Sequence, residues 1–407
     1  MRQGRRAWIG AVEAARLLRV SRATLYAYVS RGLIRSQPSP GAPRERLYAH
    51  DDLLRLQRQA EARRAPDKAA ARALEWGMPI LESAITLIDG RRLYYRGLDV
   101  ADLARARSLE EIAALIWTGR FESVAAGEEG EEKGEPLHPV LGAAFVTRAQ
   151  ILLATAAARD PSAMDLRTEA VARTGRRIVR LLTRAATRRP FDAAAVHSAL
   201  ATEWNVGARG VDVMRAALVL CADHELNVSS FTARCVASAG SHPYAVVSAA
   251  LAALEGPRHG GASARAESML HAMRRSRALG ATLAARLRRG ESIHGFGHPL
   301  YRDGDPRAGV LLDLLSERYA KSAECRFVTD FAQAATDMIG EPPNVDFALA
   351  AVSRVLHLPA NAPLTLFAVG RSVGWIGHAI EQYATGQLIR PRAKYVGHPA
   401  QPPQPDR

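Results

Sequence analysis

The sequence predicts a mainly α-helical protein that carries a small, basic helix-turn-helix unit at its N-terminus. Ala- and Leu-rich segments with helical periodicity fill residues 140–290, and one clear β signal precedes them. Positive charge is concentrated in residues 1–72, which hold 16 Lys and Arg against 6 Asp and Glu. That segment supplies +10 of the formal net charge of +14, so the rest of the chain is close to neutral. A basic N-terminal segment (residues 1–72, the head) followed by a near-neutral remainder (residues 73–407, the body) indicates a partner that carries phosphate.

The head contains the pattern of two short helices joined by a tight turn. The stretch AVEAARLLRV (11–20) has helical apolar spacing, and Ser21 is a suitable N-cap for a second helix. Gly32 is placed to end that helix in a left-handed conformation. The pattern is typical of a helix-turn-helix.

A Pro/Gly loop, a short Arg-flanked strand and a further helix starting at Asp51 follow the second helix. In this order, residues 1–60 resemble the winged helix-turn-helix domain of the MerR and excisionase type. The resemblance implies DNA binding through the start of the second helix, by Ser21, Arg22, Thr24 and Tyr26. The alternative is a basic appendage that only packs on the body or on a second copy of the chain.

Two further segments are predicted to lack a fold of their own. Residues 61–74 are charged and Ala-rich, which indicates a linker, and the Pro-rich stretch PAQPPQPDR (399–407) indicates a disordered tail. Between them, SAITLIDGRRLYYRG predicts a tight hairpin around Asp89-Gly90. In SLEEIAALIWTG, Ser108 and Glu111 have the spacing of a capping box.

Composition excludes several classes of protein. The N-terminal stretch MRQGRRAWIG has no apolar core of a signal peptide, and the longest apolar runs are too short to span a bilayer. The cysteines number three, with no CxxC pair. We therefore expect a cytoplasmic protein with no membrane partner and with its thiols reduced.

Several common active-site motifs are absent from the sequence. It has no GxxxxGK[ST] phosphate loop and no GxSxG nucleophile motif, and HELNV (224–228) lacks the second histidine of a zinc protease. His294 and His298 have a spacing that metal ligands use on helices, but the glycines and proline around them argue against a helix. No metal site is predicted.

Five segments place uncommon residues beside glycine, proline or asparagine. They are DHELNVSSFTAR (223–234), GPRHGGASA (256–264), GFGHPLYRDGDPRA (295–308), PPNVDFALA (342–350) and GRSVGWIGHAIEQYATGQLIRPR (370–392). Taken singly, each histidine is better explained as a structural residue. Together, in this order and spacing, the segments resemble the citrate synthase family from about residue 75 to 397.

The resemblance implies a fold and a reaction. The fold is a citrate synthase-like large domain (75–259 and 353–398) plus a small helical domain (260–352), working as a homodimer. The reaction joins acetyl-CoA or another short acyl-CoA to oxaloacetate and hydrolyses the thioester, so CoA enters as part of a substrate and no separate cofactor is expected. Removing a proton from a thioester methyl group requires a nearby carboxylate base and a donor to the developing enolate oxygen.

Roles for individual residues follow from the same resemblance. Asp346 is the base, His259 donates to the enol oxygen and His298 polarises the oxaloacetate carbonyl. The carboxylates of oxaloacetate are expected to bind Arg307, Arg371 and Arg390, with Arg390 reaching across the dimer interface, and His224 also contacts this substrate. The CoA is expected to bind Arg302 and the backbone at Gly295 and Gly297.

Three positions depart from the pattern usual in the family. Pro299 replaces a basic residue, Ser263-Ala264 replaces Asn-Glu, and Ala348 replaces tyrosine. All three are near the expected site, so the acyl-CoA preference is open and 2-methylcitrate synthesis from propionyl-CoA is an alternative. Another alternative is a DNA-binding regulator that uses the body as a metabolite sensor.

Overall fold

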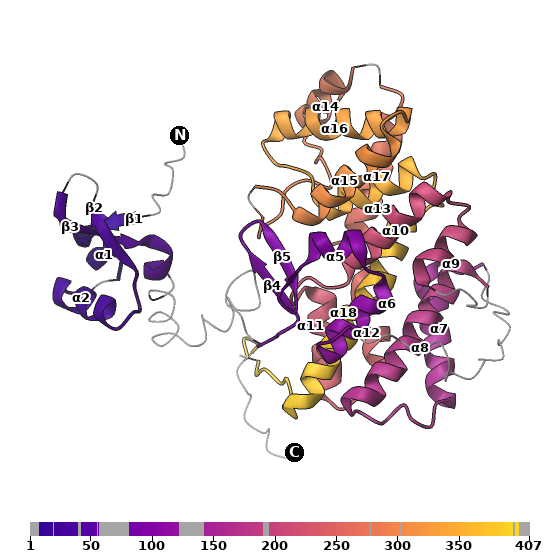
Figure 1. Ribbon diagram of the computed structural model, residues 1–407, viewed down its shortest axis with the longest axis horizontal. Helices are drawn as coiled ribbons and strands as arrows, with labels where there is room; N and C mark the ends of the chain where they lie inside the picture. The colour runs from indigo at the N-terminus through magenta and orange to yellow at the C-terminus, as the bar shows by residue number, and fades with distance from the viewer. Residues whose placement is uncertain are drawn as a thin grey trace, which may run out of the picture. The chain divides into compact units, whose positions relative to one another are not determined.

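The computed structural model describes residues 8–18, 20–39, 42–54, 56, 81–121, 142–189, 195–276, 278–301, 303–393 and 395–398. The chain divides into two compact units, Met1–Glu82 and Ser83–Arg407, whose elements are labelled in Figure 1. The predicted linker 61–74 and the predicted tail 399–407 lie outside the described residues, as does Arg302.

The N-terminal unit combines a helix pair with a three-stranded antiparallel sheet of order β1-β3-β2. Its labelled elements are β1 (Trp8–Gly10), α1 (Ala11–Leu18), α2 (Arg22–Ser30), β2 (Ser36–Ser39) and β3 (Ala42–Ala49), and residues 50–54 are helical as well, close to the predicted start at Asp51. A small core of its own holds it together, formed by Ile9, Ala14, Ala15, Leu25, Ile34, Tyr48 and Leu53. The hairpin of β2 and β3 is the predicted wing, whereas β1 was not expected from the sequence.

The predicted ends of the second helix are confirmed. The Ser21 side chain accepts a hydrogen bond from the amide of Thr24, and Gly32 has φ +72° just beyond the last turn. The amide of Leu33 bonds to the carbonyl of Tyr28, which closes the helix in the manner of a Schellman motif. Local sequence therefore determines this helix-turn-helix.

The body begins with the predicted hairpin. Strands β4 (Thr86–Asp89) and β5 (Arg92–Tyr95) pair antiparallel, and β6 (Leu98–Asp99) adds a short third strand. Asp89 pairs with Arg92, so the two turn residues are Gly90 and Arg91, one position later than the sequence indicated. Helices α5 (Val100–Ala106) and α6 (Leu109–Thr118) follow, and the capping box of α6 is confirmed.

Seven further helices pack around one apolar core. They are α7 (Phe145–Arg159), α8 (Thr168–Thr187), α9 (Val196–Glu203), α10 (Ala208–Cys221), α11 (Val228–Ser238), α12 (Pro243–Glu255) and, after a long interval in the chain, α18 (Ala362–Thr385). Helix α18, yellow in Figure 1, runs through the middle of this group and is buried over most of its length. Gly374 allows α18 to lie close to Ala222 and Asp223, because a Cβ at this position would collide with both residues.

Helices α13–α17 form the orange part of the body in Figure 1. They are α13 (Gly261–Met273), α14 (Leu279–Arg288), α15 (Pro306–Tyr319), α16 (Ala323–Ile339) and α17 (Val345–Val355). Helices α13–α16 fall within 260–352, the predicted small domain, and α17 starts within it and ends three residues beyond it. They belong to the same compact unit as α5–α12 and α18, so the boundary between a large and a small domain stays a prediction. No helix in the described part of the chain is long and apolar enough to cross a membrane.

Candidate active site

The loop that carries His298 is hydrogen-bonded to the segment that starts α17. The amide of Gly297 donates to the carbonyl of Pro342 over 2.9 Å, and the amide of Asn344 donates to the carbonyl of Gly295 over 2.9 Å. Asn344 also donates from its side chain to the carbonyl of Gly297 over 2.9 Å, while its Oδ1 caps α17 by accepting from the amide of Asp346. One asparagine therefore fixes the loop of His298 relative to Asp346.

Gly295 and Gly297 have positive φ, +85° and +74°, as their role in a shaped loop requires. A Cβ on Gly295 would lie 2.8 Å from Cβ of Phe347. The ring of Phe296 packs against Phe347, with ring centroids 4.9 Å apart. The glycines thus allow the loop to lie directly on α17.

His298, His224 and Tyr301 form a compact group beside this loop. The imidazoles of His224 and His298 meet edge to face with centroids 5.2 Å apart, and Nε2 of His224 lies 2.9 Å from the Tyr301 hydroxyl. Burial, together with the charge of Arg307, lowers the pKa of His298 to about 4, and burial holds the pKa of His224 well below its usual range. Both rings are therefore neutral near pH 7, which suits hydrogen-bond donation to a carbonyl.

His259 occupies the turn between α12 and α13. Its Nε2 lies 2.9 Å from the Ser229 hydroxyl, and a neutral ring that accepts there carries its proton on Nδ1. The Ser229 hydroxyl itself accepts a hydrogen bond from the indole of Trp375 at 3.1 Å. Among the described residues, none bonds to Nδ1, so this nitrogen is available to a substrate. Burial, with a contribution from the charge of Arg371, lowers the pKa of His259 to about 4.

Two buried guanidinium groups differ in their partners. Arg307 forms a bidentate pair with Asp305, at 2.9 Å from Nε and 2.7 Å from Nη2. Burial opposes the charge of Arg307, but Asp305 outweighs burial and raises its pKa. Arg371 is fully buried and donates from Nε to the carbonyl of Cys221 over 2.8 Å, while Nη1 and Nη2 have no partner among the described residues.

Unpartnered buried donors of this kind favour an anionic ligand, because a buried charge without a counter-ion is costly. The planar, paired nitrogens of Arg371 match a carboxylate.

Asp346 is the second residue of α17 and accepts a 2.5 Å hydrogen bond from the Ser263 hydroxyl at Oδ1. Burial raises the pKa of this carboxyl, opposed by Ser263 and by Arg307. A carboxylate in such surroundings is more basic than one in water, which is the property that a proton acceptor needs.

The predicted residues share one electrostatic environment. The charge of Arg307 acts on His224, His298 and Asp346, and that of Arg371 acts on His224 and His259. Arg390 is exposed in the segment after α18, and no contact among the described residues links it to the group. The predicted contact of Arg302 with CoA lies outside the described residues. No cluster of three or more His, Cys, Asp or Glu suited to a metal ion occurs in the described part.

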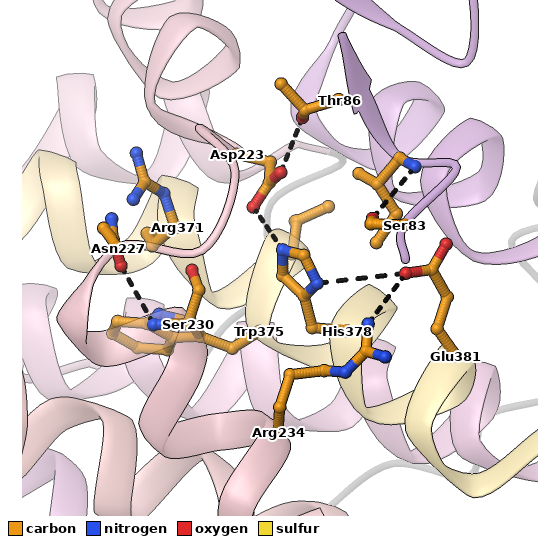
Figure 2. A network of polar contacts seen from close by, with 12 residues as sticks. Ser83, Thr86, Asp223, Asn227, Ser230, Arg234, Arg371, Trp375, His378 and Glu381 are labelled. Atoms are coloured by element: carbon orange, nitrogen blue, oxygen red, sulfur yellow. Dashed lines mark hydrogen bonds and ion pairs between the residues drawn. The ribbon is translucent and has the colours of Figure 1, made fainter. Parts of the chain in front are cut away.

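Several residues in contact with this group were not singled out from the sequence as functional. They are Tyr301, Ser229, Asp305 and Asp223, each inside or beside one of the five segments. Their sequence signal was only their nearness to the histidines and arginines. Asp223 is part of the buried polar network in Figure 2, where it accepts from the Thr86 hydroxyl at 2.5 Å and faces Nε2 of His378 at 3.2 Å.

The predicted DNA-contacting residues lie at the start of α2. Ser21, Arg22 and Tyr26 are exposed, Tyr26 by 52%, and Thr24 is partly buried. The hydroxyls of Ser21 and Thr24 lie 2.9 Å apart. Three of the four side chains are thus accessible from one end of the helix.

Residues 73–392 match the protein-family model described as "Citrate synthase, C-terminal domain". The chain belongs to the citrate synthase family. Residues 8–61 separately match the model described as "Helix-turn-helix domain". Both resemblances expected from the sequence are thereby confirmed.

Individual members of the family support the assignment. The citrate synthase of Haloferax volcanii is 33% identical over 367 residues, covering 80% of this chain and 95% of that protein. The 2-methylcitrate synthase of Shewanella oneidensis is 34% identical over 189 residues, covering 46% of this chain and 50% of that protein.

A solved structure agrees with the fold of this family member. The citrate synthase of Thermoplasma acidophilum, in a ternary complex with carboxymethyl coenzyme A and oxaloacetate, superposes with a TM-score of 0.67 at 25% identity. The superposition covers 82% of this chain and 98% of that one. The mainly helical architecture expected from the sequence is confirmed.

Proposed function

We propose that this protein condenses acetyl-CoA with oxaloacetate and hydrolyses the resulting thioester to citrate and CoA. Membership of the citrate synthase family supports the reaction. The geometry supports it through one observation above all: two buried arginine charges act on three neutral histidines and one carboxyl of raised pKa. Two cationic groups suited to a dianion thus act on the same residues as a base and neutral donors.

The assigned roles follow the chemistry of each group. Asp346 takes the proton from the acyl methyl group, and Nδ1 of His259 stabilises the enol oxygen. His298 and His224 polarise the keto group of oxaloacetate, whose carboxylates bind Arg307 and Arg371. Neutral imidazoles suit these tasks because they donate a hydrogen bond while the carboxyl base stays ionised.

The CoA part of the substrate is assigned to the loop that precedes His298. We propose that it lies along the loop of Gly295 and Gly297, whose shape depends on the positive φ of both glycines. The family resemblance supports a contribution of Arg302 to CoA binding. A cytoplasmic location, expected from the cysteine usage, stays a prediction.

The test is release of free CoA thiol from acetyl-CoA in the presence of oxaloacetate. Asp346→Asn keeps the size of the side chain but removes the base, so we expect the rate to fall by about 10²- to 10⁴-fold. The matched control is Asp337→Asn, whose carboxylate is exposed on α16 and bonds only Gln333 among the described residues. Folded wild type that releases no CoA would refute the proposal.

The alternative acyl donor is propionyl-CoA, favoured by the similarity to a 2-methylcitrate synthase. One methylene in a pocket changes binding by only about 1–3 kcal/mol, so the choice needs a direct comparison. The ratio of kcat/KM for acetyl-CoA and propionyl-CoA in the same assay decides between the two.

We also propose that residues 1–60 bind DNA. The exposed Ser21, Arg22 and Tyr26 at the start of α2 and the +10 charge of residues 1–72 support this. The test is fluorescence anisotropy with a random-sequence duplex over a series of salt concentrations. Loss of one phosphate contact in Arg22→Ala should reduce the salt slope by about 1, whereas Arg318→Ala on the body should not change it. Absence of binding even at low salt would refute DNA binding and favour the alternative that residues 1–60 only pack against the rest of the chain or a second copy.

A further inference from the structure

One hydroxyl lies directly against the carboxylate proposed as the base. Oγ of Ser263 donates to Oδ1 of Asp346 over 2.5 Å, and the serine is only 1% exposed. Among the described residues, no donor bonds to Oδ2 of Asp346. The two oxygens of this carboxylate therefore differ. Oδ1 accepts a hydrogen bond from Ser263, whereas Oδ2 accepts none from the described residues.

The hydroxyl reaches Asp346 because the first turns of α13 and α17 lie next to each other. Ser263 is in the first turn of α13, just after His259, and Asp346 is in the first turn of α17. A serine in a helix commonly bonds to its own backbone. Here it bonds across to the neighbouring helix, at a position where the family usually has asparagine.

We propose that Ser263 is a positioning residue that holds Oδ1 of Asp346 so that Oδ2 faces the acyl methyl group. The inference rests on the proposed function, because it takes Asp346 as the base. Without the hydroxyl, the carboxylate is free to rotate about its Cβ–Cγ bond. Proton abstraction then loses the fixed geometry on which its rate depends.

The hydroxyl also opposes the effect of burial on the same carboxyl. Burial raises the pKa of Asp346, while Ser263 lowers it. The charged groups facing Asp346 are Arg265 on α13 and Asp305 and Arg307 before and at the start of α15, with the thiol of Cys221 on α10 also near. These stay in place when Ser263 is replaced, so Ser263→Ala should raise the pKa and move the acidic limb of kcat/KM to higher pH.

The helix pair offers a matched control. Ser353 on α17 is 3% exposed and donates to Oε1 of Glu267 on α13 over 2.9 Å. Ser353→Ala thus removes an equivalent buried hydroxyl-to-carboxylate bond between the same two helices, but away from Asp346. Ser263→Thr keeps a hydroxyl at the first position and serves as the conservative variant.

The experiment measures kcat, KM for oxaloacetate and the pH profile of CoA release for these three variants. We expect Ser263→Ala to lower kcat by about 10- to 100-fold, as for a lost hydrogen bond to a charged group, with KM nearly unchanged. Ser263→Thr should retain most activity, and Ser353→Ala should leave kcat and the acidic limb as in the wild type. Equal effects of the two alanine variants, with no shift of the limb, would overturn the inference.

A readout without turnover separates this inference from the proposed function. The carboxyl carbon of Asp346 can be followed by NMR in ¹³C-aspartate-labelled protein and assigned by its loss in Asp346→Asn. A higher midpoint of titration in Ser263→Ala than in the wild type supports the role of the hydroxyl, and an unchanged midpoint overturns it. Wild type that releases no CoA would instead refute the condensation itself.

Discussion

Nε2 of His378 lies 3.2 Å from Oδ1 of Asp223, and both side chains are fully buried between α18 and the segment that carries His224 (Figure 2). Burial alone would raise the pKa of Asp223, but His378 and Arg371 outweigh it and lower the pKa. On the other side of His378, Glu381 pairs with Arg234 at 3.0 Å and accepts the amide of Ala84 at 2.8 Å. The network therefore joins the start of the body, α11 and α18 beside the site.

Asp223→Ala should strongly destabilise the body. The change leaves the Thr86 hydroxyl and His378 without their buried partner, and breaking a buried pair from one side costs about 3–5 kcal/mol. The free energy of unfolding in urea measures this. The control is Glu317→Ala, which breaks an exposed pair with Arg105 and should change the free energy of unfolding little, because exposed ion pairs are weak. Similar losses for both variants would mean that the network contributes little.

Gly295→Ala should impair both stability and CoA release. The residue has φ +85°, and its new Cβ would lie 2.8 Å from Cβ of Phe347 and 3.0 Å from its Cα, next to Asp346. Gly290→Ala isolates the backbone cost of about 1–2 kcal/mol, since Gly290 has φ +76° with open space around it. Urea unfolding and the thiol assay should show a larger loss for Gly295→Ala. Equal results would indicate that the loop adjusts without disturbing α17.

Arg371→Gln should weaken oxaloacetate binding. The variant lacks Nη1 and Nη2, the nitrogens proposed to donate to a carboxylate of oxaloacetate. KM for oxaloacetate should therefore rise by at least about tenfold, as for a lost charge-assisted hydrogen bond. In the wild type, oxaloacetate at 100 times Kd should stabilise the fold by about 2.7 kcal/mol. Differential scanning fluorimetry should show that this stabilisation is lost in the variant. The same thermal shift in both proteins would place the carboxylate elsewhere.

Mixing two inactive variants tests whether Arg390 acts across a dimer. Asp346→Asn and Arg390→Ala homodimers should each be inactive or nearly so. If the sites use Arg390 of the partner, each heterodimer regains one intact site, so refolding an equal mixture should restore about a quarter of wild-type activity. No recovery, with heterodimers shown by differential tags, would place Arg390 in its own chain's site. An active Arg390→Ala homodimer would place it outside both sites.

Protonation of His259 and His298 should not limit activity between pH 8 and 6. Their pKa values of about 4 keep both rings neutral in that range. Below pH 6.5 the unfolded chain takes up protons at these residues and the folded chain does not, so stability should fall between about pH 6.5 and 4. Urea unfolding at pH 7 and 5 should show a smaller drop for His298→Gln than for the wild type. An equal drop would indicate that His298 titrates normally when folded.

The sequence alone determined the features that depend on neighbouring residues. Ser21 and Gly32 delimit a helix, Ser108 and Glu111 cap another, and the β runs around Asp89-Gly90 form a hairpin, because each depends on backbone bonding within a few positions. Motifs in a fixed order likewise identified the family. Strand β1 escaped prediction because it is three residues long and exists only by pairing with β3.

Only the tertiary structure decided which of those residues act on one another. Asn344 fastens the loop of His298 to α17, and Ser263 reaches Asp346, across 47 and 83 positions of chain. No local pattern encodes such contacts, because they follow from how the helices pack. The neutral state of His259 and His298 and the raised pKa of Asp346 are consequences of burial, which the folded chain alone provides.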